Sequence, residues 1–328
     1  MARRDLKISV KNADVCKFPC DVLVLKYAQA WHGADLAVAT DLRLGAGWSL
    51  DADYVAAGDY KFVETEGKIK PNYVLIEGVP RLRQLDYVLI RNFSKKALFH
   101  LQKEMPDARH IAMPMHGVNF GMDERESFLS QLAGTLEALS VQSILPKLEE
   151  LTFVEKNAGR AQRLQQLVEE NYFPRETFPR ETAQQDQVKM TAPVASAGAS
   201  SNEKPHVFVA MPFSPDFEDV YIFGIQGPVQ EAGLLCERVD MDRFTGDIVE
   251  RIKSRIATAK FIIADLTTSN ANVYLEVGYA WGTKVEAVLL CKNVEELKFD
   301  VKGQRCIVYS SINDLKKKLT EELKHYTR

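Results

Sequence analysis

Short apolar segments alternate with segments of helical periodicity along most of the chain, and this alternation constrains the fold more than any other feature. The apolar segments include Leu6–Val10, Asp21–Lys26, Val207–Met211 and Phe261–Leu266. Strands that are apolar at every position are buried on both faces, and a parallel sheet covered by helices on both sides provides that burial. The sequence therefore predicts an α/β protein built from three-layer domains with mostly parallel sheets.

A compositional break divides the chain. Residues 173–204 contain a tandem FPRET and are rich in Pro, Ser, Ala and Gln, without apolar periodicity. Such composition is typical of a flexible linker. We therefore expect a domain over residues 1–172, a linker over 173–204 and a second domain over 205–328.

Each domain has its own series of expected strands. In the first domain they are Leu6–Val10, Asp21–Lys26, Tyr60–Thr65, Tyr73–Glu77, Tyr87–Arg91, His110–Met113 and Leu151–Glu155. In the second they are Val207–Met211, Leu234–Val239, Phe261–Leu266, Ala287–Cys291 and Cys306–Tyr309. The second series alternates with four expected helices and suits a flavodoxin-like or Rossmann-like sheet, in which ligands bind at the carboxyl ends of the strands.

Composition narrows the classes of partner. With 42 Lys and Arg against 45 Asp and Glu, the net charge of −3 argues against an extended nucleic-acid-binding surface. No apolar run approaches the roughly 20 residues that span a bilayer, so we expect no membrane partner. The five cysteines lack the spacing of a zinc site, so we expect no metal. We also expect no cofactor, and a reducing, cytoplasmic compartment.

Polar residues and turn-forming residues gather at the ends of the expected strands of the second domain. Met211 ends the first strand and Pro212-Phe213 follows it, and Asp240 follows the second. Asp265 ends the third, and Asn270, Asn272, Tyr274, Glu276 and Gly278 come soon after it. Because the carboxyl ends of parallel strands meet at one edge of a sheet, these groups are predicted to form one small-molecule site.

Glu276 is the candidate catalytic residue. We expect its helix to begin near Asn272, so that the helix dipole keeps the carboxylate ionised at neutral pH. A carboxylate opposite a leaving base can stabilise, or bond to, the oxocarbenium-like carbon formed when an N-glycosidic bond breaks. Asp265 is expected to hold a sugar hydroxyl or the base. Either residue alone is more often a dipole partner or a cap than a catalyst.

The run Ile262–Gly282 resembles the signature of the nucleoside 2-deoxyribosyltransferase superfamily, which includes TIR-like N-glycosidases. Val207–Phe213, Asp265 and Glu276-Val-Gly-Tyr-Ala280 match its opening strand, its Asp and its Glu-x-Gly-Tyr-Ala. The resemblance implies that Glu276 is the nucleophile and that the protein is a homo-oligomer. Asn272-Val273-Tyr274 stands where the transferases often have Asp and Gly-Thr, a form more similar to relatives in bacterial defence that hydrolyse NAD or nucleotides.

The first domain resembles macro domains more weakly. Asp14 matches the residue that holds the adenine amino group there, and Gly33-Ala-Asp35 matches the start of a helix. The segment Gly117-Val118-Asn119-Phe120-Gly121 is similar to the phosphate loop of that family. Lys26-Tyr27-Ala28 replaces the Asn-rich motif of the hydrolases, so the resemblance implies ligand binding without hydrolysis; a purely structural scaffold is the alternative.

Three functions remain open at this point. The first is cleavage of NAD, a nucleoside or a nucleotide by the second domain, controlled by a small nucleotide-type ligand of the first, in an anti-phage defence effector. The second is a nucleoside deoxyribosyltransferase of salvage. The third is a non-enzymatic nucleotide sensor. A second nucleotide-type domain favours the first function, since a salvage enzyme needs no such partner.

Overall fold

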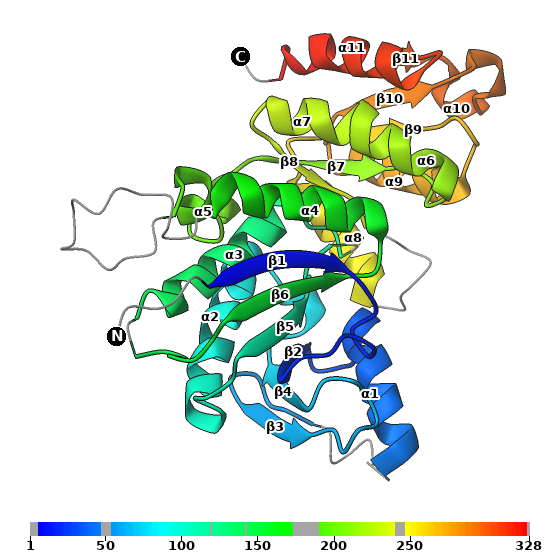
Figure 1. Cartoon of the computed structure of the whole chain (residues 1–328). Coiled ribbons are helices and arrows are strands. Elements are labelled where there is room, and N and C mark those ends of the chain that lie inside the picture. Colours follow the sequence, from blue (N-terminus) through cyan, green and yellow to red (C-terminus); the bar gives the residue numbers. More distant parts are fainter. Residues whose placement is uncertain are drawn as a thin grey trace, which may run out of the picture. The chain divides into compact units, whose positions relative to one another are not determined.

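The computed structural model describes residues 6–46, 54–118, 120–141, 143–172, 190–239 and 247–326. The chain divides into two compact units. The first contains Met1–His116 and Arg125–Asn202, and the second contains Gly117–Glu124 and Glu203–Arg328 (Figure 1). The two units confirm the α/β class predicted from the sequence, because each is built on a mostly parallel sheet.

The first unit contains a six-stranded sheet in the order β1-β6-β5-β2-β4-β3. Only the β3–β4 pair is antiparallel. The strands are β1 (Lys7–Asn12), β2 (Val22–Tyr27), β3 (Tyr60–Glu64), β4 (Tyr73–Gly78), β5 (His110–Pro114) and β6 (Glu150–Glu155). The helices between them are α1 (Gly33–Ala46), α2 (Tyr87–Glu104), α3 (Glu124–Leu139) and α4 (Ala158–Asn171), with a short 3-10 turn η2 (Leu82–Gln84).

Helices cover both faces of this sheet. Val154 of β6 packs in one cluster with Val38 and Leu42 of α1. Its neighbour Phe153 points to the opposite face, because successive side chains of a strand alternate, and meets Phe128 of α3 at a ring-centroid distance of 5.1 Å. The sheet is therefore the middle layer of three.

One segment of the first unit differs from its prediction. The sequence predicts a strand at Tyr87–Arg91, but these residues form the first turn of α2. The backbone N–H of Leu89 donates to Asp86 Oδ1 at 2.8 Å, so Asp86 caps the helix. Leu98 and Leu101 continue the buried face that Ile90 begins. The apolar run Tyr87–Arg91 is short enough to form either a strand or a helix, and the cap at Asp86 selects the helix.

The described part of the predicted linker packs on the first unit. Residues 192–196 form α5 (Ala192–Ser196), and Arg91 Nη1 donates to the carbonyl oxygens of Ala195 and Ala197. Ser201 Oγ donates to Glu126 Oε1 at 2.5 Å, where the short turn η4 (Ser201–Glu203) begins. This contrasts with the flexible linker predicted over 173–204; residues 173–189 lie outside the described ranges.

A buried ion pair crosses the first unit from β2 to α1. Lys26 Nζ donates to Asp35 Oδ2, and the Lys26 backbone N–H donates to Asp35 Oδ1 at 3.3 Å. Both side chains are almost fully buried. Burial raises the pKa of Asp35, and the Lys26 ammonium opposes that rise. Each charge is therefore held in the interior by the other.

The second unit contains a five-stranded parallel sheet in the order β11-β10-β9-β7-β8. Numbered from the first strand of the unit, this is the order 2-1-3-4-5 of a flavodoxin-like sheet, as predicted. The strands are β7 (His206–Ala210), β8 (Leu235–Glu237), β9 (Phe261–Asp265), β10 (Ala287–Cys291) and β11 (Cys306–Val308). The first and third strands of the unit, β7 and β9, are parallel neighbours, with Val207 opposite Phe261.

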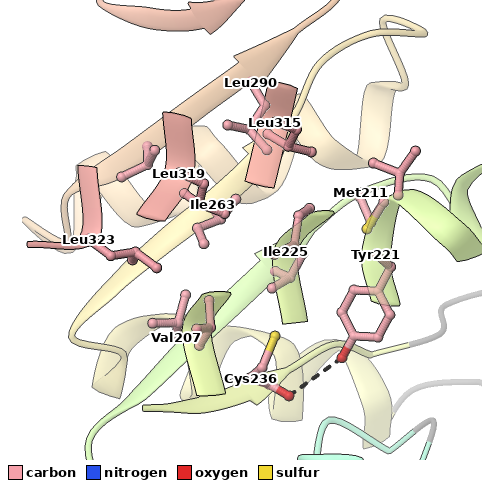
Figure 2. Packing of buried hydrophobic residues seen from close by; sticks show 14 of the residues in the cluster. Val207, Met211, Tyr221, Ile225, Cys236, Ile263, Leu290, Leu315, Leu319 and Leu323 are labelled. Carbon is pink, nitrogen blue, oxygen red and sulfur yellow. Dashed lines mark hydrogen bonds between the residues drawn. The ribbon is translucent and has the colours of Figure 1, made fainter. Parts of the chain in front are cut away.

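Helices also cover both faces of the second sheet (Figure 1). One face carries α6 (Pro215–Asp219), the π-helical segment η5 (Val220–Gln226), α7 (Gly227–Glu231) and α11 (Ile312–Leu323). The other carries α8 (Asp247–Thr258), α9 (Ala271–Gly282) and α10 (Phe299–Lys302). Figure 2 shows the first face, where Leu315, Leu319 and Leu323 of α11 pack toward Ile263 and Leu290 of the sheet.

The segment Gly117–Glu124 completes the free edge of β8. Phe120 forms an antiparallel bridge with Val239. Asp123 Oδ2 accepts from the Cys236 backbone N–H at 3.0 Å and from Gln230 Nε2 at 2.9 Å. An added bridge and a carboxylate acceptor satisfy donors that an edge strand leaves unpaired. Within the described residues, no helix of either unit is both long and apolar enough to cross a membrane.

The Lys26–Asp35 pair gives a direct test of the first unit. Lys26→Met leaves the Asp35 carboxylate buried without its partner, and we expect a loss of roughly 3–5 kcal/mol in unfolding free energy. The double variant Lys26→Met, Asp35→Leu should recover most of that loss. Lys7→Met is the matched control: it removes an exposed pair with Glu150 and should change stability by less than about 1 kcal/mol. Urea unfolding measures all three, and an equal loss in the double variant contradicts the account.

Candidate functional site

A pocket of about 200 Å³ lies at the carboxyl ends of β7 and β9 in the second unit. Five of its lining residues were predicted as binding residues, and a sixth is the predicted catalytic carboxylate. The lining residues are Val209, Met211, Pro212, Phe213, Ser214, Val239, Asn270, Asn272, Val273 and Glu276. The structure thus brings together residues from the β7–α6 loop, the end of the β8 segment and the start of α9.

The strand order explains this position. β7 and β9 are neighbours, and the chain leaves them toward opposite faces of the sheet, α6 on one and α9 on the other. Such a switch point leaves a crevice at the carboxyl ends, where open α/β sheets bind ligands. Asn270 caps α9, and its Oδ1 accepts from the Asn272 backbone N–H at 2.9 Å. The cap fixes the helix start at the mouth of the pocket.

Among the described residues of the lining, Glu276 has the one acidic side chain. This side chain lies on α9 and is only 8% exposed. Burial raises the pKa of this carboxyl to about 8. Within the described ranges it has no hydrogen bond to another residue, so nothing there offsets the loss of hydration.

This environment corrects the expected charge of Glu276. The helix begins at Ala271, with Asn270 as its cap, so Glu276 lies in the second turn and the first turn has no acidic residue. The helix dipole acts mainly within the first turn, whereas desolvation acts fully on a buried group. At neutral pH the carboxyl of the free protein is therefore mostly protonated, and an ionised form requires a higher pH or a positive partner.

Asp265 does not line the pocket. It is fully buried at the end of β9, and its Oδ1 accepts from the backbone N–H and the Oγ1 of Thr267, at 3.0 and 2.6 Å. Its Oδ2 accepts from the Tyr309 hydroxyl at 2.7 Å. Both carboxylate oxygens are thus occupied by the protein. Asp265 fixes the turn after β9, in place of the direct substrate contact that was predicted.

Two other predicted binding residues also fall outside the pocket lining. The Tyr274 hydroxyl accepts from the Lys298 backbone N–H at 3.1 Å, which ties α9 to the segment before α10. Gly278 lies on the exposed side of α9, where an added Cβ would have no other atom within 4 Å. Asp240 lies outside the described residues.

Sequence reasoning missed five residues at or next to the pocket. Val209, Ser214, Val239 and Val273 line it. Arg238 lies directly behind two lining residues, since its guanidinium carbon is 4.1 Å from the Phe213 ring centroid and its Nη1 is 3.7 Å from Met211 Sδ. The apolar residues carry no distinguishing signal. The pair Glu237-Arg238 in the expected strand Leu234–Val239 was the one available clue.

A second hollow in the same unit is larger, at about 420 Å³, but it lies at the amino-terminal end of β10, away from the carboxyl ends of β7 and β9. Trp281, Arg305 and Tyr326 are among its lining residues, and Glu276 is not. Arg305 Nη2 pairs there with Glu322 Oε2 at 2.6 Å. Arg305 and Glu322 thus compensate each other's charge, whereas the carboxyl in the smaller pocket has no partner among the described residues. We therefore place the candidate site at Glu276.

Two of the predicted ligand residues of the first domain have partners within the first unit. Asp14 Oδ1 accepts from the Cys16 backbone N–H at 3.0 Å, and Asp35 is held by Lys26. Gly33, at φ +54°, starts α1.

The predicted phosphate loop belongs to the second unit. It contains Gly117 and Val118, while Asn119 lies outside the described residues. A Cβ at Gly121, whose φ is +80°, would lie 2.6 Å from Val239 Cγ2. Glycine is thus required there for close packing on Val239, which follows β8.

Comparisons with known proteins find solved structures that resemble about half of this chain. No protein-family model matches the sequence, and the comparison with curated proteins finds no match. Similar solved structures include a macrodomain mutant from Oceanobacillus iheyensis (14% identity, TM-score 0.38, covering 51% of this chain and 94% of that one). A Trypanosoma brucei macrodomain in complex with ADP-ribose has 17% identity and a TM-score of 0.40, covering 49% and 68%.

The macro domain of ganglioside induced differentiation associated protein 2 is similar at 14% identity and a TM-score of 0.37, covering 48% of this chain and 82% of that one. Identities and TM-scores this low carry no conclusion about ligand or activity, which depend on the geometry of the site itself.

The buried carboxyl of Glu276 makes stability depend on pH. Its pKa is about 8 in the folded protein, against an ordinary value of 4.5. Between those values the folded state binds more protons than the unfolded state, so the unfolding free energy falls as pH rises. Glu276→Gln removes this contribution. We expect near-equal stabilities at pH 5 and an advantage of roughly 3 kcal/mol for the variant at pH 9.

Urea unfolding at both pH values measures this difference. Glu231→Gln is the control, because it makes the same change in charge at an exposed residue paired with Lys316. Its difference from the unsubstituted protein should be the same at pH 5 and pH 9. A Glu276→Gln difference that is equally flat means that the carboxyl is hydrated or paired.

Proposed function

We propose that the second unit cleaves the N-glycosidic bond of a nucleoside or nucleotide, NAD included, with Glu276 as the acting carboxylate. The observation that carries the proposal is the position of that carboxyl: buried, unpaired within the described ranges, and lining a pocket at the switch point of a flavodoxin-like sheet. A buried acid with a strongly raised pKa in a cleft is typical of a catalytic group.

The chemistry follows from charge compensation. When the bond between the anomeric carbon and the base nitrogen breaks, its electron pair leaves with the base and positive charge develops on the sugar. An ionised Glu276 meets that charge at low dielectric, where the attraction is far stronger than in water. Since the charge is largest in the transition state, the interaction favours the transition state over the bound substrate.

Completion of the reaction needs only water as a second reactant. The Glu276 carboxylate either stabilises the cationic sugar until water adds to the anomeric carbon, or forms an ester with that carbon which water then hydrolyses. A nucleoside base leaves as an anion and takes up the proton that the water loses, whereas nicotinamide leaves NAD as a neutral molecule and the proton of the water passes to solvent. Both routes regenerate the carboxylate, and both give a free base and a free sugar, sugar phosphate or, from NAD, ADP-ribose.

The remaining lining residues suit such a substrate. The side-chain amides of Asn270 and Asn272 provide donors and acceptors for sugar hydroxyls at the start of α9. Met211, Pro212 and Phe213 form an apolar wall suited to a planar base. We propose these five as binding residues, with Asp265 supporting them from the end of β9.

Control by a ligand of the first unit has less support than this chemistry. Asp35 is occupied by Lys26, and the predicted phosphate loop belongs to the second unit. Nucleotide sensing by the first unit, homo-oligomer formation and a role in anti-phage defence stay predictions from resemblance. Calorimetry with ADP-ribose tests the first of them directly.

Glu276→Gln tests the proposed reaction. Gln keeps the size of Glu but has no charge to oppose the cationic sugar, and it forms no ester. We expect the rate of base release to fall by at least about 10²-fold, or roughly 3 kcal/mol of barrier. The measurement is chromatography with mass detection of bases released from a panel of NAD, nucleosides, deoxynucleosides and nucleotides.

Glu231→Gln serves as the matched control and should release base at the unsubstituted rate, because that side chain is exposed and outside the pocket lining. An added second base separates transfer from hydrolysis, since only a transferase yields a new nucleoside. Undiminished base release by a folded Glu276→Gln variant excludes Glu276 as the acting group.

A further inference from the structure

An arginine is buried directly behind the wall of the candidate pocket. Arg238 follows β8 and is only 8% exposed. Its guanidinium carbon lies 4.1 Å from the ring centroid of Phe213 and 3.8 Å from that of Tyr221. Two aromatic rings and one planar cation thus form a stacked group, in which the Phe213 ring is also part of the pocket lining.

Polar contacts fix the guanidinium within this group. Arg238 Nη2 donates to Glu218 Oε2 at 2.9 Å, and Nη1 lies 3.7 Å from Met211 Sδ. Met211 is a second lining residue. A guanidinium can stack on rings and donate from its edge at the same time, whereas an ammonium cannot. The site therefore requires arginine in particular.

The backbone around Tyr221 is adapted to the same group. Tyr221 lies in η5, a π-helical segment over Val220–Gln226. π-Helices are rare and frequently occur at functional sites. Gly224 of this segment packs so closely on α11 that a Cβ would lie 2.8 Å from Leu315 Cδ2. The packing holds η5, and with it the Tyr221 ring, against Arg238 (Figure 2 shows Tyr221 and Met211 in this core).

We propose that Arg238 is a positioning residue that holds Phe213 and Met211 as a rigid wall of the pocket and thereby sets the affinity for the substrate base. Arg238 touches no reacting atom in this assignment; it acts through the two lining residues. The inference rests on the proposed function. It adds a residue to which neither composition nor spacing gives a role, and it predicts that binding and chemistry respond separately to substitution.

Arg238→Lys keeps the charge and removes the planar stack. We expect KM for base release to rise about 10-fold while kcat changes by less than about 3-fold, because the wall loosens and Glu276 is untouched. Arg255→Lys is the matched control: Arg255 Nε pairs with Glu237 Oε2 at 2.6 Å in the same unit, outside the pocket lining. Its KM should stay at the unsubstituted value. An unchanged KM for Arg238→Lys, or a fall confined to kcat, overturns the proposal.

Chemical rescue separates positioning from general stability. In Arg238→Ala, millimolar guanidinium chloride should restore KM, and ammonium chloride at the same ionic strength should not, because only guanidinium is planar. Equal rescue by both salts, or rescue by neither in a folded variant, contradicts a stacking role.

A readout without substrate distinguishes failure of this inference from failure of the proposed function. Fluorine NMR of protein labelled with 4-fluorophenylalanine, with Phe213 assigned by Phe213→Leu, reports on the ring itself. We expect a shifted, ordered Phe213 resonance that moves toward the free amino acid in Arg238→Lys and does not move in Arg255→Lys. If no substrate releases a base but the resonance moves, the proposed function is wrong and the positioning of Phe213 by Arg238 is supported. If bases are released and the resonance does not move, the positioning role of Arg238 is wrong.

Discussion

Burial of the central sheet on both faces is the constraint from which the candidate site follows. In the second unit every residue of β7 and β9 is buried, with α11 and η5 on one side and α8 and α9 on the other. Positions inside such strands are covered by helices and apolar, so polar chemistry is confined to the segments that follow the strands. At β7 and β9 those segments diverge toward opposite faces, and the pocket lies between them. The location of Glu276 is therefore a consequence of topology, and its chemistry is a consequence of what surrounds it.

The site differs from other buried charged positions because its carboxyl has no partner among the described residues. Lys26 and Asp35 in the first unit show the ordinary arrangement, in which a buried charge has a partner. Asp265, only eleven positions before Glu276, has both oxygens occupied by Thr267 and Tyr309. Glu276 alone of these carboxyls faces the pocket, and among the described residues no partner offsets the rise in its pKa that burial causes. Stability given up at such a position is recovered when a positive centre forms beside it, which makes the group suited to stabilising a transition state.

The sequence predicted the features that depend on local residue patterns. Its predictions were wrong or missing where contacts between distant parts of the chain determine the role of a residue. Apolar strands and parallel sheets follow from periodicity, which left a flavodoxin-like and a Rossmann-like order both open. The residues after β7 and β9 reach one pocket because strand ends meet at one edge. The prediction of a strand at Tyr87–Arg91 is wrong because a short apolar run fits both elements, and the Asp86 cap makes it helical. The roles of Asp265, of Gly121 against Val239 and of Arg238 between two rings depend on partners distant in the chain. No spacing in the sequence encodes those partners.

The central claim is that an ionised, desolvated Glu276 acts on the N-glycosidic bond. Its most direct test compares two pKa values in one protein. The first is the pKa of the Glu276 carboxyl, measured by carbon-13 NMR of labelled glutamate. The second is the pKa that governs kcat/KM for base release, which reports on the free enzyme, measured with a substrate that has no group titrating between about pH 6 and 10. The account predicts that both lie near 8 and that kcat/KM rises with pH through that value. A carboxyl that titrates near 4.5, or a rate that is flat or falls across the same range, would contradict it.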